Sequence, residues 1–128
     1  MEAIVVITVL ALLQYTWFGT EVAGVRVKLD CPAPAESGPP QFERMNRVHH
    51  NTLEQIVMFL PALWLYGYYV NFLWAAGFGI VYLVGRFIYR AAYLKDPSSR
   101  TLGFGLTILP SAVMLVWVFV VAIGRMIS

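Results

Sequence analysis

Residues 42–61 read FERMNRVHHNTLEQIVMFLP and pass without a break from charged side chains into a fully apolar run. We interpret this stretch as one helix that enters a membrane. At about 3.6 residues per turn, Arg47, Asn51 and Glu54 share one face of that helix. Polar and ionisable groups at bilayer depth need partners, which makes them candidates for a functional site. Two interpretations stay open: a pocket for a zwitterionic ligand, or a structural polar seam between helices.

The composition places the rest of the chain in the same membrane. Of the 128 residues, 59% are hydrophobic and 12% are charged, whereas about a quarter of the residues in ordinary globular domains are charged. The chain is too short for a separate soluble domain, so we expect one domain over residues 1–128. The single cysteine, Cys31, excludes an intrachain disulfide, and nothing near it in the sequence would lower the pKa of its thiol.

The fold class predicted from the apolar runs is all-α, an integral membrane four-helix bundle. We expect helices at about 3–25, 41–70, 72–94 and 101–127, since about 20 apolar residues cross a bilayer. The first run is not interpreted as a cleaved signal peptide, because Glu2 stands where a basic segment would be. The prolines of the segment DCPAPAESGPP end the first helix and favour an extended loop.

Lysine and arginine are distributed unevenly between the two ends of such a bundle. Four spans place both termini on one side and the two charged connections on the other. Eight basic residues lie on that second side: Arg26, Lys28, Arg44, Arg47, Arg86, Arg90, Lys95 and Arg100. The positive-inside rule therefore predicts a multi-pass protein whose first and third loops are cytoplasmic, with both termini opposite.

A second polar stripe follows the third predicted helix. Tyr82, Arg86, Tyr89 and Tyr93 recur at i, i+4, i+7 and i+11 and share a face, with Arg90 beside it. The two arginines could reach the headgroups by snorkelling, an interpretation that we favour for Arg90. Tyr89 and Tyr93 could be ordinary interfacial aromatics, which is the commoner use of tyrosine at such a position.

On the second predicted helix, Glu54 is the only evident intramembrane carboxylate. A bound anion is more plausible for Arg47, because Asn51 shares its face. Seven positions separate Arg47 from Glu54, about 10.5 Å along the axis, so we expect no direct contact between them. His50 is placed to pair with Glu54 one turn on.

Two blocks of residues resemble the membrane-associated proteins in eicosanoid and glutathione metabolism, the MAPEG family. One block is GPPQFERMNRVHHNTLE at residues 38–54, and the other is the series Tyr89, Tyr93 and Arg100 with its spacing. Both match a synthase member of that family at one constant offset, without gaps. The four-span hydropathy covers the remaining chain.

The resemblance implies a homotrimer that binds glutathione as co-substrate at subunit interfaces. The residues that would bind the tripeptide are Arg26, Arg47, His49, Asn51, Glu54, Tyr89 and Tyr93. Arg100 would be the catalytic residue that stabilises the glutathione thiolate. The chemistry is consistent, because glutathione carries two carboxylates and an ammonium group, which call for arginines and one acid. An arginine also stays charged beside a thiol.

The chain departs from the family pattern within this face. His49 stands where the matching synthase has glutamine, and Gln55 where it has tyrosine, and either change could re-orient the tripeptide. A metal site is not expected, because His49 and His50 point about 100° apart and no third ligand completes a site. We expect His49 to act as a hydrogen-bonding or interfacial side chain.

The function predicted by the resemblance is a membrane-bound glutathione transferase. It would conjugate glutathione to lipophilic electrophiles that enter from the bilayer, with peroxidase activity on lipid hydroperoxides as a secondary outcome. Its partners would be further copies of the chain, the bilayer and the electrophile, and no nucleic acid. Two alternatives stay open: a non-catalytic lipid-binding scaffold of the same family, or a structural membrane protein whose polar seam holds a trimer together.

Overall fold

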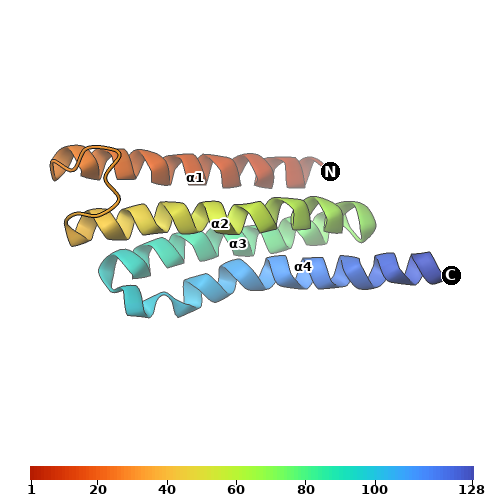
Figure 1. The fold of residues 1–128 in the computed structure, drawn as a ribbon. Coiled ribbons are helices and arrows are strands. Elements are labelled where there is room, and N and C mark those ends of the chain that lie inside the picture. Colours follow the sequence, from red (N-terminus) through yellow and green to blue (C-terminus); the bar gives the residue numbers. More distant parts are fainter.

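The computed structural model describes residues 1–128 and consists of four long helices with one short 3₁₀ turn. The helices are α1 (Glu2–Lys28), α2 (Pro40–Tyr69), α3 (Phe72–Lys95) and α4 (Thr101–Ile127), and the 3₁₀ turn η1 (Pro97–Ser99) precedes α4. The helices alternate in direction, and α2 and α3 lie between α1 and α4 (Figure 1). The predicted all-α four-helix fold is confirmed.

Local sequence signals explain where the helices begin. The α2–α3 turn contains only residues 70–71, and the Asn71 side chain caps α3 by accepting hydrogen bonds from the backbone of Leu73 (2.8 Å) and Trp74 (3.0 Å). Pro40 occupies the first turn of α2, where a missing N–H costs nothing. Asp96 ends α3 and caps η1 through the Ser98 backbone N–H at 3.1 Å. The chain therefore reverses direction over few residues.

Three segments are long and apolar enough to cross a membrane: Glu2–Lys28, Phe72–Lys95 and Pro97–Ile127. The other helix, α2, has 30 residues, but its first half carries the charged and polar side chains of residues 43–55. Large apolar side chains remain exposed along the outer faces of α1 and α4, among them Leu13 at 58% and Phe119 at 66%. A contiguous apolar exterior of this kind fits a bilayer.

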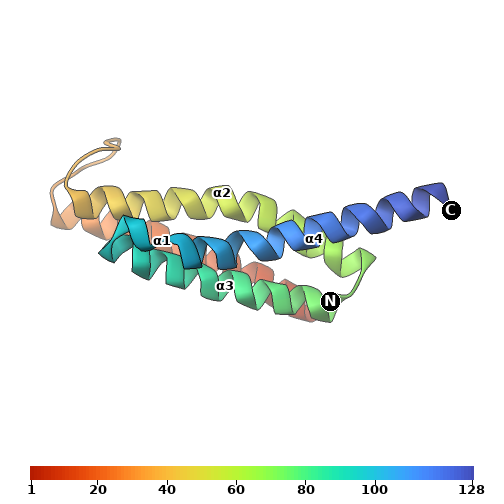
Figure 2. The same ribbon diagram turned by 90° about the horizontal axis from the view of Figure 1, so that it is seen from below.

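The interior contains two apolar clusters at different depths. One comprises 13 buried residues, including Ile4, Phe59 and Met114, and lies toward the two termini. The second comprises 7, including Phe18, Phe42 and Tyr89, and lies toward the charged connections. Both termini lie at one end of the bundle, and both charged connections lie at the other (Figures 1 and 2). The candidate site residues belong to the charged end.

Candidate functional site

The central polar face lies on α2, where the helical period places Arg47, Asn51 and Glu54 together. Asn51 is 6% exposed, and its side-chain oxygen has no hydrogen-bond partner within the chain. An unsatisfied buried amide oxygen is costly, so such an atom calls for a donor from a ligand or another chain. Arg47 and Glu54 lie at the surface of the same face, with side chains 51% and 56% exposed.

Arg47 and Glu54 contact each other directly, so the expectation that seven positions separate them too widely is wrong. The Nη1 atom of Arg47 lies 3.3 Å from Oε1 of Glu54. The expectation counted only the rise along the helix axis, whereas two long side chains lean toward each other along one face. An exposed pair of this kind contributes about 0–1 kcal/mol. Glu54 pairs with Arg47, and the expected pair with His50 is absent.

Beneath this face, Arg86 of α3 is fully buried and does not snorkel. Its Nη2 donates to the Thr52 hydroxyl at 2.7 Å and its Nη1 to the Thr107 hydroxyl at 3.4 Å. Its guanidinium also lies 4.4 Å from the ring centroid of Tyr89. No carboxylate contacts this cation, and its Nε has no partner. Arg86 therefore joins α2, α3 and α4 and adds positive charge below the polar face.

Tyr89 and Tyr93 stack on α3, with ring centroids 5.5 Å apart and planes inclined by 20°. Tyr89 is buried at 2% exposure, so it is not an ordinary interfacial aromatic. Tyr89 also belongs to the same apolar cluster as Val48 of α2, and Phe104 of α4 packs against that cluster. The α2 face, the tyrosine pair and the start of α4 thus converge at one place.

The start of α4 lies against Tyr89 because Gly103 permits the approach. A Cβ atom at Gly103 would lie 2.8 Å from the Tyr89 Cβ and closer still to the backbone nitrogen and Cα of Tyr89. Arg100 immediately precedes α4 as its N-cap, and its guanidinium donates through Nη1 to the Pro97 carbonyl oxygen at 2.8 Å. Arg100 also lines a cleft of about 470 Å³ together with Ser98, Thr101 and Phe104.

Two predicted site residues lie on the α1 side of α2 and not with the others. His49 stacks on Tyr15 of α1 at 4.6 Å and packs against Gly19, where a Cβ would lie 3.0 Å from the imidazole Nε2. Arg26 of α1 lies 4.5 Å from the Phe42 ring centroid and donates to the Ala35 carbonyl at 2.8 Å. One chain therefore groups Arg47, Asn51, Glu54, Tyr89, Tyr93 and Arg100, and separates Arg26 and His49 from them.

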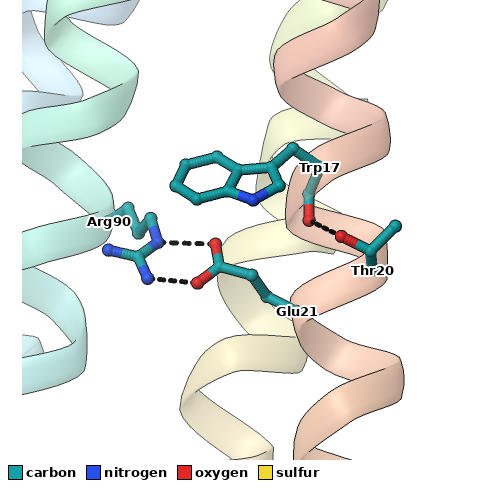
Figure 3. A network of polar contacts seen from close by, with 4 residues as sticks. All are labelled: Trp17, Thr20, Glu21 and Arg90. Carbon is teal, nitrogen blue, oxygen red and sulfur yellow. Dashed lines mark hydrogen bonds and ion pairs between the residues drawn. The ribbon is translucent and has the colours of Figure 1, made fainter.

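Arg90 forms an ion pair and does not snorkel, which corrects the interpretation favoured from the sequence. Its guanidinium makes two parallel hydrogen bonds to the Glu21 carboxylate of α1, one of them 2.8 Å between Nε and Oε1. The Trp17 ring centroid lies 5.4 Å from the guanidinium carbon, and Figure 3 shows the indole beside the pair. Glu21 is therefore a second intramembrane carboxylate. The sequence feature that could have predicted this carboxylate is the position of Glu21 as a lone acid within an apolar run.

An apolar cleft of about 530 Å³ runs along the outer face of α4. It is lined only by hydrophobic residues, including Val113, Val116 and Trp117.

The chain contains no group of three or more His, Cys, Asp and Glu side chains that could hold a metal ion. Sequence reasoning missed Gly103 and the two hydroxyls that hold Arg86 at the site, and it missed Glu21 outside the site. None of these is evident from the period of a single helix.

Comparisons with known proteins identify the family of this chain. A family model described as the MAPEG family matches residues 4–120. The uncharacterised protein sll1147 of Synechocystis is 40% identical over 110 residues, which cover 86% of this chain and 80% of that protein. Microsomal glutathione S-transferase 2 of Homo sapiens is 33% identical over 102 residues, covering 80% and 69%. Leukotriene C4 synthase of Bos taurus is 33% identical over 94 residues, covering 73% of this chain and 63% of the synthase.

The family match extends over nearly the whole chain, and it agrees with the four-helix fold and its apolar exterior. We conclude that this integral membrane protein belongs to the MAPEG family.

Proposed function

We propose that the chain is a membrane-bound glutathione transferase that conjugates glutathione to lipophilic electrophiles. The observation that carries the proposal is the convergence of Arg47, Asn51 and Glu54 with the Tyr89–Tyr93 pair, which places cations and an unsatisfied amide in an otherwise apolar bundle. Two relatives bear the names of a glutathione transferase and a leukotriene synthase, which supports the same class of reaction.

The exposed ion pair on α2 suits a zwitterionic tripeptide. The Arg47–Glu54 contact is half-exposed and weak. A bound glutathione would exchange it for two stronger contacts, with a carboxylate on Arg47 and the ammonium group on Glu54. The Asn51 oxygen would accept a hydrogen bond from a peptide N–H of the ligand. Binding would thus satisfy an amide oxygen that the chain alone leaves without a partner.

Arg26 and His49 complete the site from a neighbouring chain in this proposal. Both lie on the α1 side, away from the Tyr89 cluster of their own chain. A ring of three chains would bring the α1 side of one chain to the α2 face of the next, with one site at each interface. Arg26 uses only its Nη1 atom for the loop carbonyls, so its Nη2 and Nε remain available for a carboxylate.

The role of Arg100 is to favour the thiolate of bound glutathione. A free thiol with a pKa of about 8.5 is mostly protonated at neutral pH, and a guanidinium nearby stabilises the anion. The proton leaves to water, the sulfur lone pair then forms a C–S bond, and the bond from that carbon to the electrophile's leaving group breaks, with the leaving group taking the electron pair. The electrophile's reacting carbon would lie at the start of α4 beside this thiolate, and its apolar remainder would extend along α4 toward the cleft beside Trp117.

The same thiolate could attack a lipid hydroperoxide. The sulfur would then take the terminal oxygen, the O–O bond would break, and a lipid alcohol would leave. A second glutathione would reduce the resulting sulfenic acid to the disulfide and water. No further oxidant or cofactor is needed for either reaction.

Arg100→Ala tests the proposed function. We expect glutathione affinity to stay within about threefold, while turnover of a generic aromatic electrophile falls about 10- to 100-fold, since one charge near a thiolate contributes about 1–3 kcal/mol. Ultraviolet absorbance of the bound thiolate should decrease in parallel. The matched control is Lys95→Ala, which removes an exposed cation from the same end of the bundle.

Two outcomes would contradict the proposal. Wild-type turnover in Arg100→Ala would remove that residue from catalysis. If the unmodified protein does not bind glutathione, the proposed site has no ligand. That result would favour the alternative of a non-catalytic lipid-binding scaffold.

A further inference from the structure

A second polar cleft lies between α1, α2 and α3 at the charged end of the bundle. Its volume is about 510 Å³, and its lining includes Glu21, Gly24 and Lys28 of α1, Arg44 of α2 and Arg90 of α3. None of these residues belongs to the proposed glutathione site. The cleft is therefore a separate feature of the chain.

The charges that line this cleft do not cancel. Glu21 is the only acid among them, and its carboxylate is already taken up by Arg90. Lys28 has no hydrogen-bond or ion-pair partner. Arg44 donates through Nη1 to the carbonyls of Leu94 (3.2 Å) and Lys95 (3.4 Å), which leaves its Nη2 and Nε free. Neither cation therefore has an ion-pair partner in contact, the Asp96 carboxylate being within electrostatic range of Arg44 but outside the lining of the cleft. Arg44 is held in position by its bonds to the end of α3.

A second, apolar cleft lies further along α1 and α3, toward the middle of the membrane. It has a volume of about 300 Å³ and lies between α1 and α3, lined by Leu10, Leu13, Gln14, Trp17, Leu83 and Phe87. Glu21 and Arg90 line the first cleft and Trp17 lines the second, and the Trp17 indole lies beside the Glu21–Arg90 pair (Figure 3). We call the two clefts together the α1–α3 groove. It is cationic at its outer end and apolar at its inner end.

The groove is long enough to cover one leaflet of a bilayer. On α1 its lining runs from Leu10 to Lys28, 18 positions or roughly 27 Å along the helix axis. Half of a bilayer with its headgroup region measures about 20–22 Å. Lys28 is the last residue of α1 and Arg44 lies in the second turn of α2, so both cations lie at headgroup level when the apolar cleft lies among acyl chains.

We propose that the α1–α3 groove binds one anionic glycerophospholipid. Its phosphate lies between Lys28 and Arg44, and one acyl chain follows the apolar cleft past Trp17. The two unpaired cations select an anionic headgroup over a zwitterionic one. The apolar extension distinguishes a lipid from a free phosphate, which would need only the outer end. This inference is independent of the proposed glutathione chemistry.

Lipid binding can be counted directly on the full chain. Protein purified in a neutral maltoside detergent is titrated with dioctanoyl phosphatidic acid, and adducts are resolved by native mass spectrometry. We expect one tightly bound lipid per chain and an affinity at least tenfold higher than that for dioctanoyl phosphatidylcholine. Millimolar inorganic phosphate should not displace the lipid.

Two variants probe the cations and one probes the cleft itself. Lys28→Gln and Arg44→Gln should each lower the affinity about tenfold. Because Lys28 has no partner in the chain, its replacement leaves the fold unaltered even if loss of Arg44 loosens α3. Gly24→Leu should also lower the affinity, since a Cβ at Gly24 meets nothing within 4 Å and the side chain would fill the cleft.

Matched controls separate specific binding from a general lipid shell. Lys95→Gln removes an exposed cation at the same end of α3, and Gly77→Leu adds the same side chain at another open glycine of the bundle. Both should bind like the unmodified protein.

Four results would each overturn the proposal. Equal weakening by Lys95→Gln, or equal affinity for phosphatidylcholine, would indicate a non-specific shell. Displacement by inorganic phosphate would indicate a site for soluble anions. Unchanged affinity in Gly24→Leu would show that the lipid does not occupy the cleft.

Discussion

Gly103→Ala tests how closely the start of α4 must approach α3. The Cβ of the alanine would lie 2.8 Å from the Tyr89 Cβ, whereas ordinary contacts of this kind measure 3.4–4 Å. The nearest atoms belong to the Tyr89 backbone, within a helix, so they cannot rotate away as the end of a flexible side chain would. The two helices must therefore separate locally.

The expected cost follows from two opposing terms. Overpacking of a close contact costs about 1–3 kcal/mol, and replacement of glycine by alanine within a helix gains about 1 kcal/mol. Gly103→Ala should therefore lower the free energy of unfolding by up to about 2 kcal/mol. Gly105→Ala is the control, because a Cβ there meets nothing within 4 Å. It shares the helix-propensity gain, so the difference between the two variants isolates the cost of the contact.

Unfolding by sodium dodecyl sulfate in maltoside micelles measures the stability term, and turnover of an aromatic electrophile measures the effect on the site. Separation of α4 from Tyr89 moves Arg100, which lies three residues before Gly103, so turnover should fall more in Gly103→Ala than in Gly105→Ala. Equal stability and turnover in the two variants would refute the inferred close contact between Gly103 and Tyr89.

Three further predictions concern polar contacts. Glu21→Gln should destabilise the bundle by leaving Arg90 unpaired, and a double-mutant cycle with Arg90→Gln should return a coupling energy of about 1–3 kcal/mol, because the two side chains are only 21% and 26% exposed. A coupling near zero in thermal unfolding would contradict the pair. Arg47→Met should leave the assembly intact on size-exclusion chromatography, since its ion pair is exposed, while glutathione affinity in a titration falls tenfold or more. Dissociation with unchanged affinity would make Arg47 structural. Hydrogen bonds from the Ser98 backbone and hydroxyl lower the pKa of Asp96 below its ordinary value of 3.8. The stabilisation by Asp96 is therefore present above about pH 4 and lost as the pH falls further, so the melting temperatures of the unmodified protein and Asp96→Ala should converge below pH 4 and remain apart at pH 7.

Much of the architecture follows from the sequence alone. Long apolar runs and short polar connections predict the four-helix fold, because a chain in lipid must satisfy its backbone hydrogen bonds within each span. Helical periodicity places Arg47, Asn51 and Glu54 on one face, and the structure confirms this shared face. These inferences hold because each concerns a single helix, whose geometry depends only on residue spacing.

The contacts between helices were decided by the tertiary structure. The sequence cannot tell which helix lies opposite Arg90, and its partner Glu21 lies 69 positions away. Arg86 finds its hydroxyl partners on two other helices, so its burial depends on how α2 and α4 are rotated about their axes. Periodicity fixes the angle of a side chain around its own helix, but the rotation of each helix against its neighbours follows from packing the whole bundle, including the close approach of Gly103 to Tyr89.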